Sequence, residues 1–433
     1  MASEKRIITP DKVQSLQRTL YRKAKENARW RAWSLYGELC RQDVLATALA
    51  AVVRNAGAPG VDGVTTEAVA AQADVFLTAL QTQLREKSYR PSPVLRVWIP
   101  KADGKQRPLG IPTVKDRVVQ TALQLLLEPI FEADFHEASY GYRPGKNAHQ
   151  AMEAISQSLL RGKTEVIDAD LSGYFDSIDH AALLRLVARR VSDGSILELV
   201  KRFLKAPIVE EKSGQRSIHP NDRGTPQGGV ISPLLANLYL NSLDHGVNDN
   251  PSLEATLVRY ADDFVLLCRP GHGAALHARL QRYLERKGLK LNEAKTRVLD
   301  ARAESFQFLG FRVAWRSSWR TGRSYPFVEP SPRARQKLRN TVRVHLSRWT
   351  TQASCVASVA AVNRAVRGWS HYFHYGNCTK TFAEMQRWLR QRLRGWLWQK
   401  YGRKHGFYSF FSDDRLHGQY QLFTLPTRAP YLR

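Results

Sequence analysis

The amino-acid sequence predicts an α+β protein, with a sheet covered by helices on one face and a basic helical region after it. Two patterns lead to this fold class. Apolar strand-like segments, TEVIDADL (164–171) and TLVRYADDFVLLC (256–268), alternate with longer segments of helical periodicity. After about residue 330 the strand-like segments give way to helical stripes rich in Arg and Trp.

The composition indicates a folded protein of more than one domain and a negatively charged partner. With 433 residues, of which 43% are hydrophobic and 10% aromatic, the chain is long enough for two or three packed domains and is not disordered. Its 66 Lys and Arg residues outnumber 39 Asp and Glu residues, which leaves a formal charge of +27. This charge favours a polyanionic partner, with nucleic acid as the first candidate and an anionic membrane surface as the second. No apolar segment approaches the roughly 20 residues that a membrane-spanning helix needs.

The first part of the chain is expected to be mainly helical. Residues 1–60 combine cationic and apolar positions at helical spacing and end in a Gly- and Pro-rich turn, which predicts a basic helical extension. A helix over 74–87, a strand over 94–100 and a hairpin turn over 102–105 should follow. A further helix is predicted from Val118 to Phe131, and it should be buried because apolar residues cover most of its circumference.

The middle of the chain carries the strand and loop patterns on which the candidate site depends. TEVIDADL should be a buried strand that leads, through a polar and aromatic turn, into a helix beginning near His180. A Gly- and Pro-rich loop, GTPQGG (224–229), opens the next long helix. TLVRYADDFVLLC then predicts two short strands on either side of an acidic hairpin tip.

The last quarter of the chain is strongly basic. Residues 331–433 contain 19 Lys and Arg against 3 acidic residues, together with five of the ten Trp residues. Arg335, Arg339 and Arg343 recur every four residues and would share one helical face, which suits either a solvated surface or an RNA-binding surface. The scarcity of acids and the interleaved aromatics favour an RNA-binding helical domain. One apolar stripe should be buried within it: Phe382, Met385, Leu389, Leu393, Trp396 and Leu397.

Three aspartates are candidates for a metal site. Asp262 and Asp263 are neighbours, so they would face opposite sides of a regular strand, whereas at a tight hairpin tip both would reach one sheet edge. Asp170 ends the other apolar strand and would come beside this hairpin if the two strands pair. Clustered carboxylates repel each other unless a cation lies between them, and oxygen-only ligands favour Mg²⁺ over zinc. A solvated acidic turn would explain the tetrapeptide YADD as well, when it is taken alone.

An ordered series of motifs resembles the reverse transcriptases and maturases encoded by bacterial group II introns. YADD (260–263) is similar to the reverse transcriptase signature, and the resemblance continues through the maturase segment. The fold that it implies is a right-hand polymerase, with fingers and a palm built on antiparallel sheet, followed by an α-helical thumb or maturase domain. The other motifs are WIPKADGKQRPLGIPTVKDRVVQ (98–120), EASYGYRPGKNAHQA (137–151), DADLSGYFDSIDH (168–180), RGTPQGGVISPLLANLYLN (223–241), GLKLNEAKT (288–296), FQFLGF (306–311) and RAVRGWSHYFHYGN (364–377).

The resemblance implies that nucleotides are joined at a two-metal site. Asp170, Asp262 and Asp263 would be the catalytic residues and, together with the carbonyl of Leu171, the ligands of two Mg²⁺ ions, with Mn²⁺ as a substitute. One ion would activate the primer 3′-hydroxyl and the other would stabilise the pyrophosphate leaving group. The residues alone leave the role of Asp263 open, since one of two neighbours at a turn usually points outward.

The resemblance also implies a binding site for the incoming dNTP. Lys101 and Arg107 would grip the triphosphate, although an exposed basic hairpin would carry the same residues. Gln227 would contact the nucleotide, while the adjacent Gly228 and Gly229 would allow the backbone to approach nucleic acid closely. Tyr174 would exclude a 2′-hydroxyl group and so select dNTPs over NTPs. Phe175 can be aligned to that role instead, and either ring would also suit a core position.

Two further sets of residues are implied to hold nucleic acid. Phe308, Leu309, Gly310 and Phe311 are similar to the primer grip, in which a Gly-containing hairpin lies against the end of the primer. Lys295 is a candidate phosphate contact, or a plain surface lysine. The residues implied to bind RNA in the last domain are Arg335, Arg339, Arg343, Arg367 and Trp369.

The resulting hypothesis is an RNA-directed DNA polymerase that also binds its intron RNA and assists splicing and mobility. Its partners would be group II intron RNA, an RNA template with a DNA primer, dNTPs and target DNA, with no membrane. Alternatives from other classes are a non-catalytic splicing maturase and a host-adopted reverse transcriptase acting in repair or phage defence. An RNA-templated RNA polymerase is disfavoured by Tyr174 and by the resemblance.

The expected domains are a basic extension over 1–60, fingers and palm over 61–330, a thumb or maturase domain over 331–410 and a short tail over 411–433. Four scattered cysteines offer neither a disulfide framework nor a paired zinc site, which indicates a reducing, cytosolic compartment. The resemblance implies a bacterial cytoplasmic protein associated with the nucleoid or with ribonucleoprotein. Because little sequence follows the maturase segment, the resemblance is to the short intron proteins that lack an endonuclease.

Overall fold

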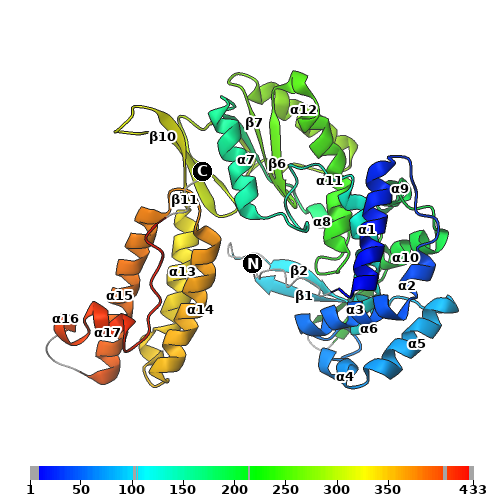
Figure 1. Cartoon of the computed structure of the whole chain (residues 1–433), viewed down its shortest axis with the longest axis horizontal. Coiled ribbons are helices and arrows are strands. Elements are labelled where there is room, and N and C mark those ends of the chain that lie inside the picture. Colours follow the sequence, from blue (N-terminus) through cyan, green and yellow to red (C-terminus); the bar gives the residue numbers. More distant parts are fainter. Residues whose placement is uncertain (1–8, 101–103, 105, 213–214, 403–406, 429–433) are drawn as a thin grey trace. The chain divides into compact units, whose positions relative to one another are not determined.

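A computed structural model of the chain describes residues 9–100, 104, 106–212, 215–402 and 407–428. It confirms the predicted α+β class, since hairpins and helices alternate up to strand β11 and, within the residues that the structure describes, only helices follow it (Figure 1). None of the helices in the described part of the chain combines the length and the apolar character that a bilayer crossing requires.

The helices and strands follow one another in a mixed order. The helices are α1 (Asp11–Glu26), α2 (Tyr36–Leu39), α3 (Gln42–Asn55), α4 (Thr66–Ala71), α5 (Ala73–Arg85), α6 (Val114–Glu132), α7 (Ala148–Leu160), α8 (Tyr174–Ser177), α9 (His180–Ala188), α10 (Gly194–Leu204), α11 (Ser232–Asn248), η1 (Pro251–Leu253), α12 (Gly273–Arg286), α13 (Pro332–His345), η2 (Arg348–Thr350), α14 (Cys355–Phe373), α15 (Thr379–Tyr401), α16 (Phe407–Phe410) and α17 (Asp413–His417). The strands are β1 (Val94–Pro100), β2 (Gln106–Ile111), β3 (Glu165–Ala169), β4 (Ile208–Lys212), β5 (Gln215–His219), β6 (Thr256–Tyr260), β7 (Asp263–Cys268), β8 (Arg297–Asp300), β9 (Phe306–Phe308), β10 (Phe311–Ser317) and β11 (Ser324–Pro330).

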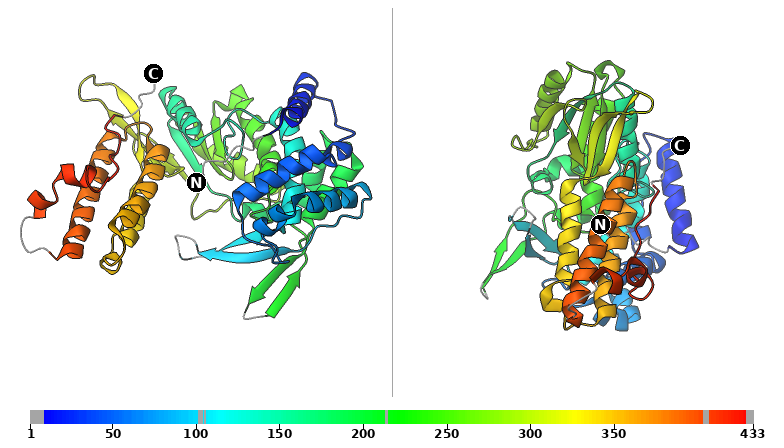
Figure 2. Two further views of the ribbon diagram at one scale, coloured as in Figure 1. Left: turned by 60° about the horizontal axis from the view of Figure 1, so that its bottom comes forward. Right: turned by 90° about the vertical axis from the view of Figure 1, so that its left-hand side faces the viewer.

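The strands form three sheets. One has the order β2-β1-β4-β5, the second β6-β7-β3-β8 and the third β11-β10-β9. Most of the strand pairings are antiparallel, but β1 pairs with β4 in parallel, because the long connection between them, which includes helices α6 to α10, lets the chain return in the same direction. Figure 2 shows the two hairpins of the first sheet, β1–β2 in cyan and β4–β5 in green, extending from the neighbouring helices.

The chain divides into two compact units. Unit 1 comprises Met1–Asn147, Ala169–Phe264 and Ala274–Thr296. Unit 2 comprises Ala148–Asp168, Val265–Gly273 and Arg297–Arg433.

Helix α6 forms the buried centre of unit 1, as its apolar circumference predicted. Its buried residues include Val118, Leu123, Leu126 and Phe131. The helix begins one turn earlier than the expected Val118, because the Thr113 side chain caps it by accepting the backbone N–H of Asp116 at 3.2 Å.

Helices α13, α14 and α15 lie side by side in unit 2 (Figure 1). The apolar stripe predicted for the longest of them, α15, is buried: Phe382, Met385, Leu389, Leu393, Trp396 and Leu397. Its charged residues lie largely outside that stripe, so the helix is held in the domain by one apolar face.

Candidate active site

A tight hairpin presents the paired aspartates. Strands β6 and β7 are joined by only two residues, Ala261 and Asp262, and Ala261 has a positive φ of 61°. A two-residue hairpin turn needs such left-handed backbone. Asp262 therefore lies in the turn, and Asp263 is the first residue of β7.

Asp170 is held at the end of β3 by a second segment of unit 1. The Asn292 N–H donates to the Asp170 carbonyl at 2.8 Å, and Leu171 forms an antiparallel bridge with Leu291. The side chains of Asn292 and Lys295 also donate to Asp170 Oδ2, at 3.0 and 3.2 Å. The motif around residue 292 thus fixes both the backbone and the carboxylate of Asp170.

The environments of the aspartates differ. Burial raises the pKa of Asp262 above its ordinary value, and the negative charge of Asp170 adds to the rise, whereas Arg107 opposes it. Asp170 and Asp262 are therefore close enough to repel one another. Asp263 is exposed, in contrast to the half-buried Asp262.

The carboxylate oxygens of Asp170 and Asp262 are of the kind that bind hard divalent ions. Asp170 and Asp262 offer only oxygen, and a cation between them would relieve their repulsion. Across the described residues, no three His, Cys, Asp or Glu groups are already arranged to hold a metal ion together. Instead, the Lys295 ammonium supplies the positive charge at Asp170, so a metal ion that binds there would compete with Lys295.

Arg107 and Gln227, which are 120 positions apart, lie together beside this site. The Arg107 Nε–H donates to Gln227 Oε1 at 2.6 Å, and the N–H of Gly110 donates to the Gln227 carbonyl at 2.5 Å. The loop that carries Gln227 is therefore docked on strand β2. Lys101, the other expected triphosphate contact, lies outside the described residues.

Gly228 is the position at which this loop cannot carry a side chain. Its φ is +109°, and a Cβ there would lie 2.4 Å from the carbonyl oxygen of Gly110. Gly228→Ala is expected to lower primer extension on an RNA template about 10²-fold, because displacing the loop by about 1 Å would move Gln227. The measurement is the initial rate of extension.

Gly145→Ala is the matched control for this substitution. Gly145 also has a positive φ, +74°, but open space surrounds its Cβ position. The control should therefore carry the backbone strain without the collision. Equal rates for the two variants would show that the close approach at Gly228 has no part in activity.

Both aromatic candidates for the sugar contact are buried. Tyr174 is 2% exposed and Phe175 is 5% exposed. The Tyr174 hydroxyl donates to the Ala236 carbonyl of α11 at 2.6 Å, and burial raises the pKa of Tyr174 well above its ordinary value. The Phe175 carbonyl accepts the Thr225 N–H at 2.7 Å, which ties this segment to the loop that carries Gln227. Both rings therefore have a packing role in the structure. The contact of either Tyr174 or Phe175 with the nucleotide sugar stays a prediction.

A buried charge network that sequence reasoning missed supports the hairpin. Arg259, on β6, is fully buried. It donates to both carboxylate oxygens of Asp244, at 2.8 and 2.5 Å, to Asn237 Oδ1 at 2.8 Å and to the Ala261 carbonyl at 2.8 Å. Burial by itself would lower the pKa of Arg259, but Asp244 raises it above the ordinary value. The one available signal was a charged residue inside an otherwise apolar strand.

The same network reaches a second loop beside the turn. Asn237 donates to the Gly141 carbonyl at 2.8 Å, and a Cβ on Gly141 would lie 2.3 Å from the Ala261 nitrogen. The N–H of Tyr140 donates to the Arg259 carbonyl at 2.8 Å. The motif over 137–151 therefore contacts the acidic hairpin directly, at the backbone of Arg259 and of Ala261.

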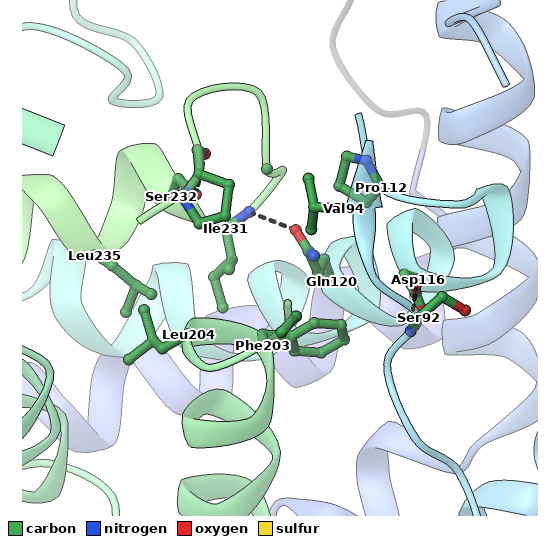
Figure 3. A pocket seen from close by; sticks show the side chains of 13 residues that line it. Ser92, Val94, Pro112, Asp116, Gln120, Phe203, Leu204, Ile231, Ser232 and Leu235 are labelled. Carbon is green, nitrogen blue, oxygen red and sulfur yellow. Dashed lines mark hydrogen bonds between the residues drawn. The ribbon is translucent and has the colours of Figure 1, made fainter. Parts of the chain in front are cut away.

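The start of helix α11 is positioned from α6. Gln120 Oε1 accepts the N–H groups of Val230 and Ile231, at 2.8 and 3.4 Å, and the second of these is drawn in Figure 3. The cavity that Figure 3 shows around Gln120 has a volume of about 10 Å³. It is no larger than one water molecule, so it is a packing gap and not a nucleotide site.

In unit 2, the FLGF segment forms a second tight hairpin. Phe308 pairs with Phe311 across a two-residue turn in which Leu309 and Gly310 both have positive φ, 51° and 80°. The Tyr372 hydroxyl donates to the Leu309 carbonyl at 3.0 Å. Phe311 is fully buried, and its ring packs against four aromatic rings at centroid distances between 5.0 and 6.3 Å: His149, Tyr372, Phe373 and Tyr375. The expected primer grip and the expected maturase segment therefore share one aromatic cluster.

The three α13 arginines that the spacing placed on one face lie toward α15 to different degrees. Arg335 forms a salt bridge with Glu384 at 3.7 Å, and the guanidinium of Arg339 lies 5.8 Å from the centre of the Trp388 ring. Arg343 also lies over Trp388, at 5.9 Å, but it is the exposed member of the set. The shared face that the spacing predicted is thus partly turned toward a neighbouring helix.

The other two RNA-binding candidates also differ in exposure. Arg367, on α14, is exposed, and its guanidinium lies 5.2 Å from the centre of the Phe423 ring. Trp369 packs against Phe373 and Phe382, at centroid distances of 5.1 and 5.3 Å, so its ring takes part in the packing of α14 on α15.

Comparison with protein families gives two matches. The family described as "Reverse transcriptase (RNA-dependent DNA polymerase)" matches residues 99–313, which include all three aspartates. The family described as "Group II intron, maturase-specific domain" matches residues 332–412. The two matches follow one another in the order of the motifs.

Three curated proteins illustrate the similarity. The chain is 35% identical over 340 residues to Protein YkfC of Escherichia coli K12, which covers 70% of this chain and 88% of that protein. It is 36% identical over 211 residues to the group II intron-encoded protein LtrA of Lactococcus lactis, covering 48% of this chain and 34% of LtrA. It is 25% identical over 386 residues to a 91 kDa protein in the cob intron of Schizosaccharomyces pombe, covering 72% of this chain and 47% of that protein.

Proposed function

The chain belongs to the RNA-directed DNA polymerases and maturases of group II introns, and from this we propose that it copies RNA into DNA by metal-dependent nucleotidyl transfer at Asp170 and Asp262. The observation that carries the proposal is the sheet order β6-β7-β3, which puts the hairpin that carries Asp262 next to the strand that precedes Asp170. Burial raises the pKa of Asp262, and the negative charge of Asp170 raises it further. They are 92 positions apart. Asp170 is fixed by hydrogen bonds from Asn292, and the turn that carries Asp262 is held by the hydrogen bond from Arg259 to the Ala261 carbonyl.

Asp170 and Asp262 would hold the divalent ions, with Asp263 and the carbonyl of Leu171 as further oxygen ligands. Bound Mg²⁺ ions would offset the negative charge that develops on the transferred phosphoryl group, and Mn²⁺ would substitute for them. Lys295 would hold the Asp170 carboxylate in place in the absence of a metal ion, since its ammonium lies 3.2 Å from Oδ2. The Arg259 network would keep the turn rigid, so that Asp262 needs no rearrangement to bind.

Arg107 and Gln227 would bind the incoming dNTP. The hydrogen bond between them orients the Arg107 guanidinium, and a fixed cation can stabilise a triphosphate without the cost of ordering a mobile side chain. Lys101 would join them. Tyr174 or Phe175 would limit the room at the sugar, which favours dNTPs over NTPs.

The maturase function would rest on unit 2. The primer end would be held by the hairpin of Phe308, Leu309, Gly310 and Phe311. The Tyr372 hydroxyl stabilises this hairpin by its hydrogen bond to the Leu309 carbonyl. Arg343 and Arg367 would contact intron RNA, since both are exposed cations. Arg335, Arg339 and Trp369 would position the helices that carry them. Intron RNA, an RNA template with a DNA primer, and target DNA are the proposed partners.

Removal of divalent metal ions provides the direct test. With a DNA primer annealed to an RNA template, the protein is expected to extend the primer with dNTPs but not with NTPs. EDTA should abolish extension, because the proposed reaction requires divalent ions bound by the carboxylates. Excess Mg²⁺ or Mn²⁺ should restore it. Extension products resolved on a denaturing gel give the measurement.

The urea midpoint of the chelated protein serves as the control, since it should equal that of the untreated protein. Extension that persists in EDTA would contradict the metal-dependent mechanism. RNA affinity without any extension, at every metal concentration, would instead favour the non-catalytic maturase.

A further inference from the structure

A cationic groove lies on unit 1, outside the proposed polymerase site. Its first part is an open cavity of about 740 Å³, bounded by α9, by the loop before Gly224 and by the end of α12. Five cationic side chains line it: Arg185, Arg189, Arg223, Arg286 and Lys287. None of these residues belongs to the metal, nucleotide, primer or maturase sets described above.

The groove continues along α12. A second open cavity of about 720 Å³ shares Glu285 and Arg286 with the first and adds Arg279 and Arg282. Arg279, Arg282 and Arg286 are spaced by three and four residues, so they follow one face of the helix. We name the seven cations of the two cavities the α12 groove.

The positive charge of the α12 groove is almost unopposed. Among the described residues, none of the seven cations forms a salt bridge, although such pairs are frequent elsewhere in the chain. The two acidic residues of the groove are engaged locally: Asp179 caps α9 through the Ala182 N–H, and Glu285 accepts from Gln281 at 3.2 Å. Seven cations thus share one surface without acidic partners.

The charge of Lys287 is destabilised by its position in the groove. Its ammonium lies over the rings of Tyr239 and Tyr283, 5.8 and 5.9 Å from their centres. Burial lowers the pKa of Lys287, and the neighbouring charge of Arg189 lowers it further. A bound anion would relieve this repulsion, since it would supply the negative charge that the surrounding side chains do not.

We propose that the α12 groove binds the phosphate backbone of an RNA strand. The inference rests on the proposed function, which makes RNA the partner, and it adds a contact surface on unit 1 to those of unit 2. Three features favour a strand over a small anion. The cations extend across two adjoining cavities, and both cavities are open to solvent. The guanidinium groups can also form bidentate hydrogen bonds with successive phosphate groups.

Two triple variants test the two parts of the groove. One is Arg279→Gln with Arg282→Gln and Arg286→Gln; the other is Arg185→Gln with Arg189→Gln and Arg223→Gln. The probe is a labelled single-stranded RNA oligonucleotide without a primer, titrated at several salt concentrations. Each variant should flatten the log–log salt dependence of affinity by about 2, that is, by about 0.7 for each lost phosphate contact.

The matched control removes the same charge from paired arginines. Arg41, Arg202 and Arg302 each form a salt bridge, so Arg41→Gln with Arg202→Gln and Arg302→Gln changes net charge equally. This control should change the salt slope by less than one phosphate contact. A groove variant whose salt slope equals that of the control would overturn the proposal.

A second measurement does not depend on any variant folding correctly. RNA should protect Lys287 from acetylation in the wild-type protein, whereas inorganic phosphate should not, and exposed Lys87 should react equally in all samples. Equal protection of Lys287 by inorganic phosphate would indicate a small-anion site and contradict the RNA proposal. Primer extension by the wild-type protein is measured separately, so that failure of the polymerase assignment remains distinguishable from failure of the groove.

Discussion

Asp262→Asn is expected to lower primer extension on an RNA template by at least about 10³-fold while leaving RNA affinity within about twofold. The substitution keeps the size of the side chain but removes the negative charge that would hold a divalent ion near Asp170. Loss of several kcal/mol of transition-state stabilisation corresponds to this factor, since each 1.36 kcal/mol changes the rate tenfold. RNA affinity should persist because the proposed phosphate contacts are arginines elsewhere in the chain.

Initial rates with saturating dNTP and a fluorescence titration with RNA give the two measurements. Asp300→Asn is the matched control, because Asp300 is an aspartate whose salt-bridge partner is the nearby Arg302. The control should extend primers at close to the wild-type rate. Parallel loss of extension and RNA affinity in Asp262→Asn would mean that polymerisation and RNA binding are not separable as proposed.

Arg259→Met is expected to destabilise the chain by about 3–5 kcal/mol and to reduce primer extension with it. Removing the guanidinium leaves Asp244 as a fully buried charge without its partner, and such a loss costs more than the ion pair itself contributes. The Ala261 carbonyl in the turn also loses its donor. Urea unfolding of the full chain, followed by Trp fluorescence, measures the change.

Two further variants separate charge from packing in this network. Arg302→Met breaks an exposed salt bridge and should leave the urea midpoint nearly unchanged. Arg259→Met combined with Asp244→Leu should recover part of the lost stability, because it removes the orphaned charge. If Arg259→Met and Arg302→Met cost the same, the buried network does not support the hairpin.

The sequence predicted elements whose residues are local in the chain. The apolar stripe of α15 and the buried helix α6 follow from helical periodicity, and both are present. The tight hairpin follows from the break between two apolar strands, although both aspartates were expected at its tip and only Asp262 lies in the turn. Each of these predictions depends only on residues within one continuous segment of the chain.

Contacts across long separations were beyond such reasoning. Arg259 meets Asn237 and Asp244 through helix α11, and no spacing rule relates a strand position to a helix position. Periodicity placed Arg335, Arg339 and Arg343 on one face, but it could not tell that this face turns toward Glu384 and Trp388. Asn292 was missed for a similar reason, since its role appears only once the segment around it pairs with residues 170–172.

The aromatic cluster around Phe311 limits how this chain can be divided. The polymerase match ends at residue 313 and the maturase match begins at residue 332, which suggests a cut between two independent modules. A fragment ending there would uncover Phe311, because Tyr372, Phe373 and Tyr375 all come from beyond the cut. An engineered polymerase based on this chain therefore has to retain helix α14, or replace the apolar surface that α14 covers.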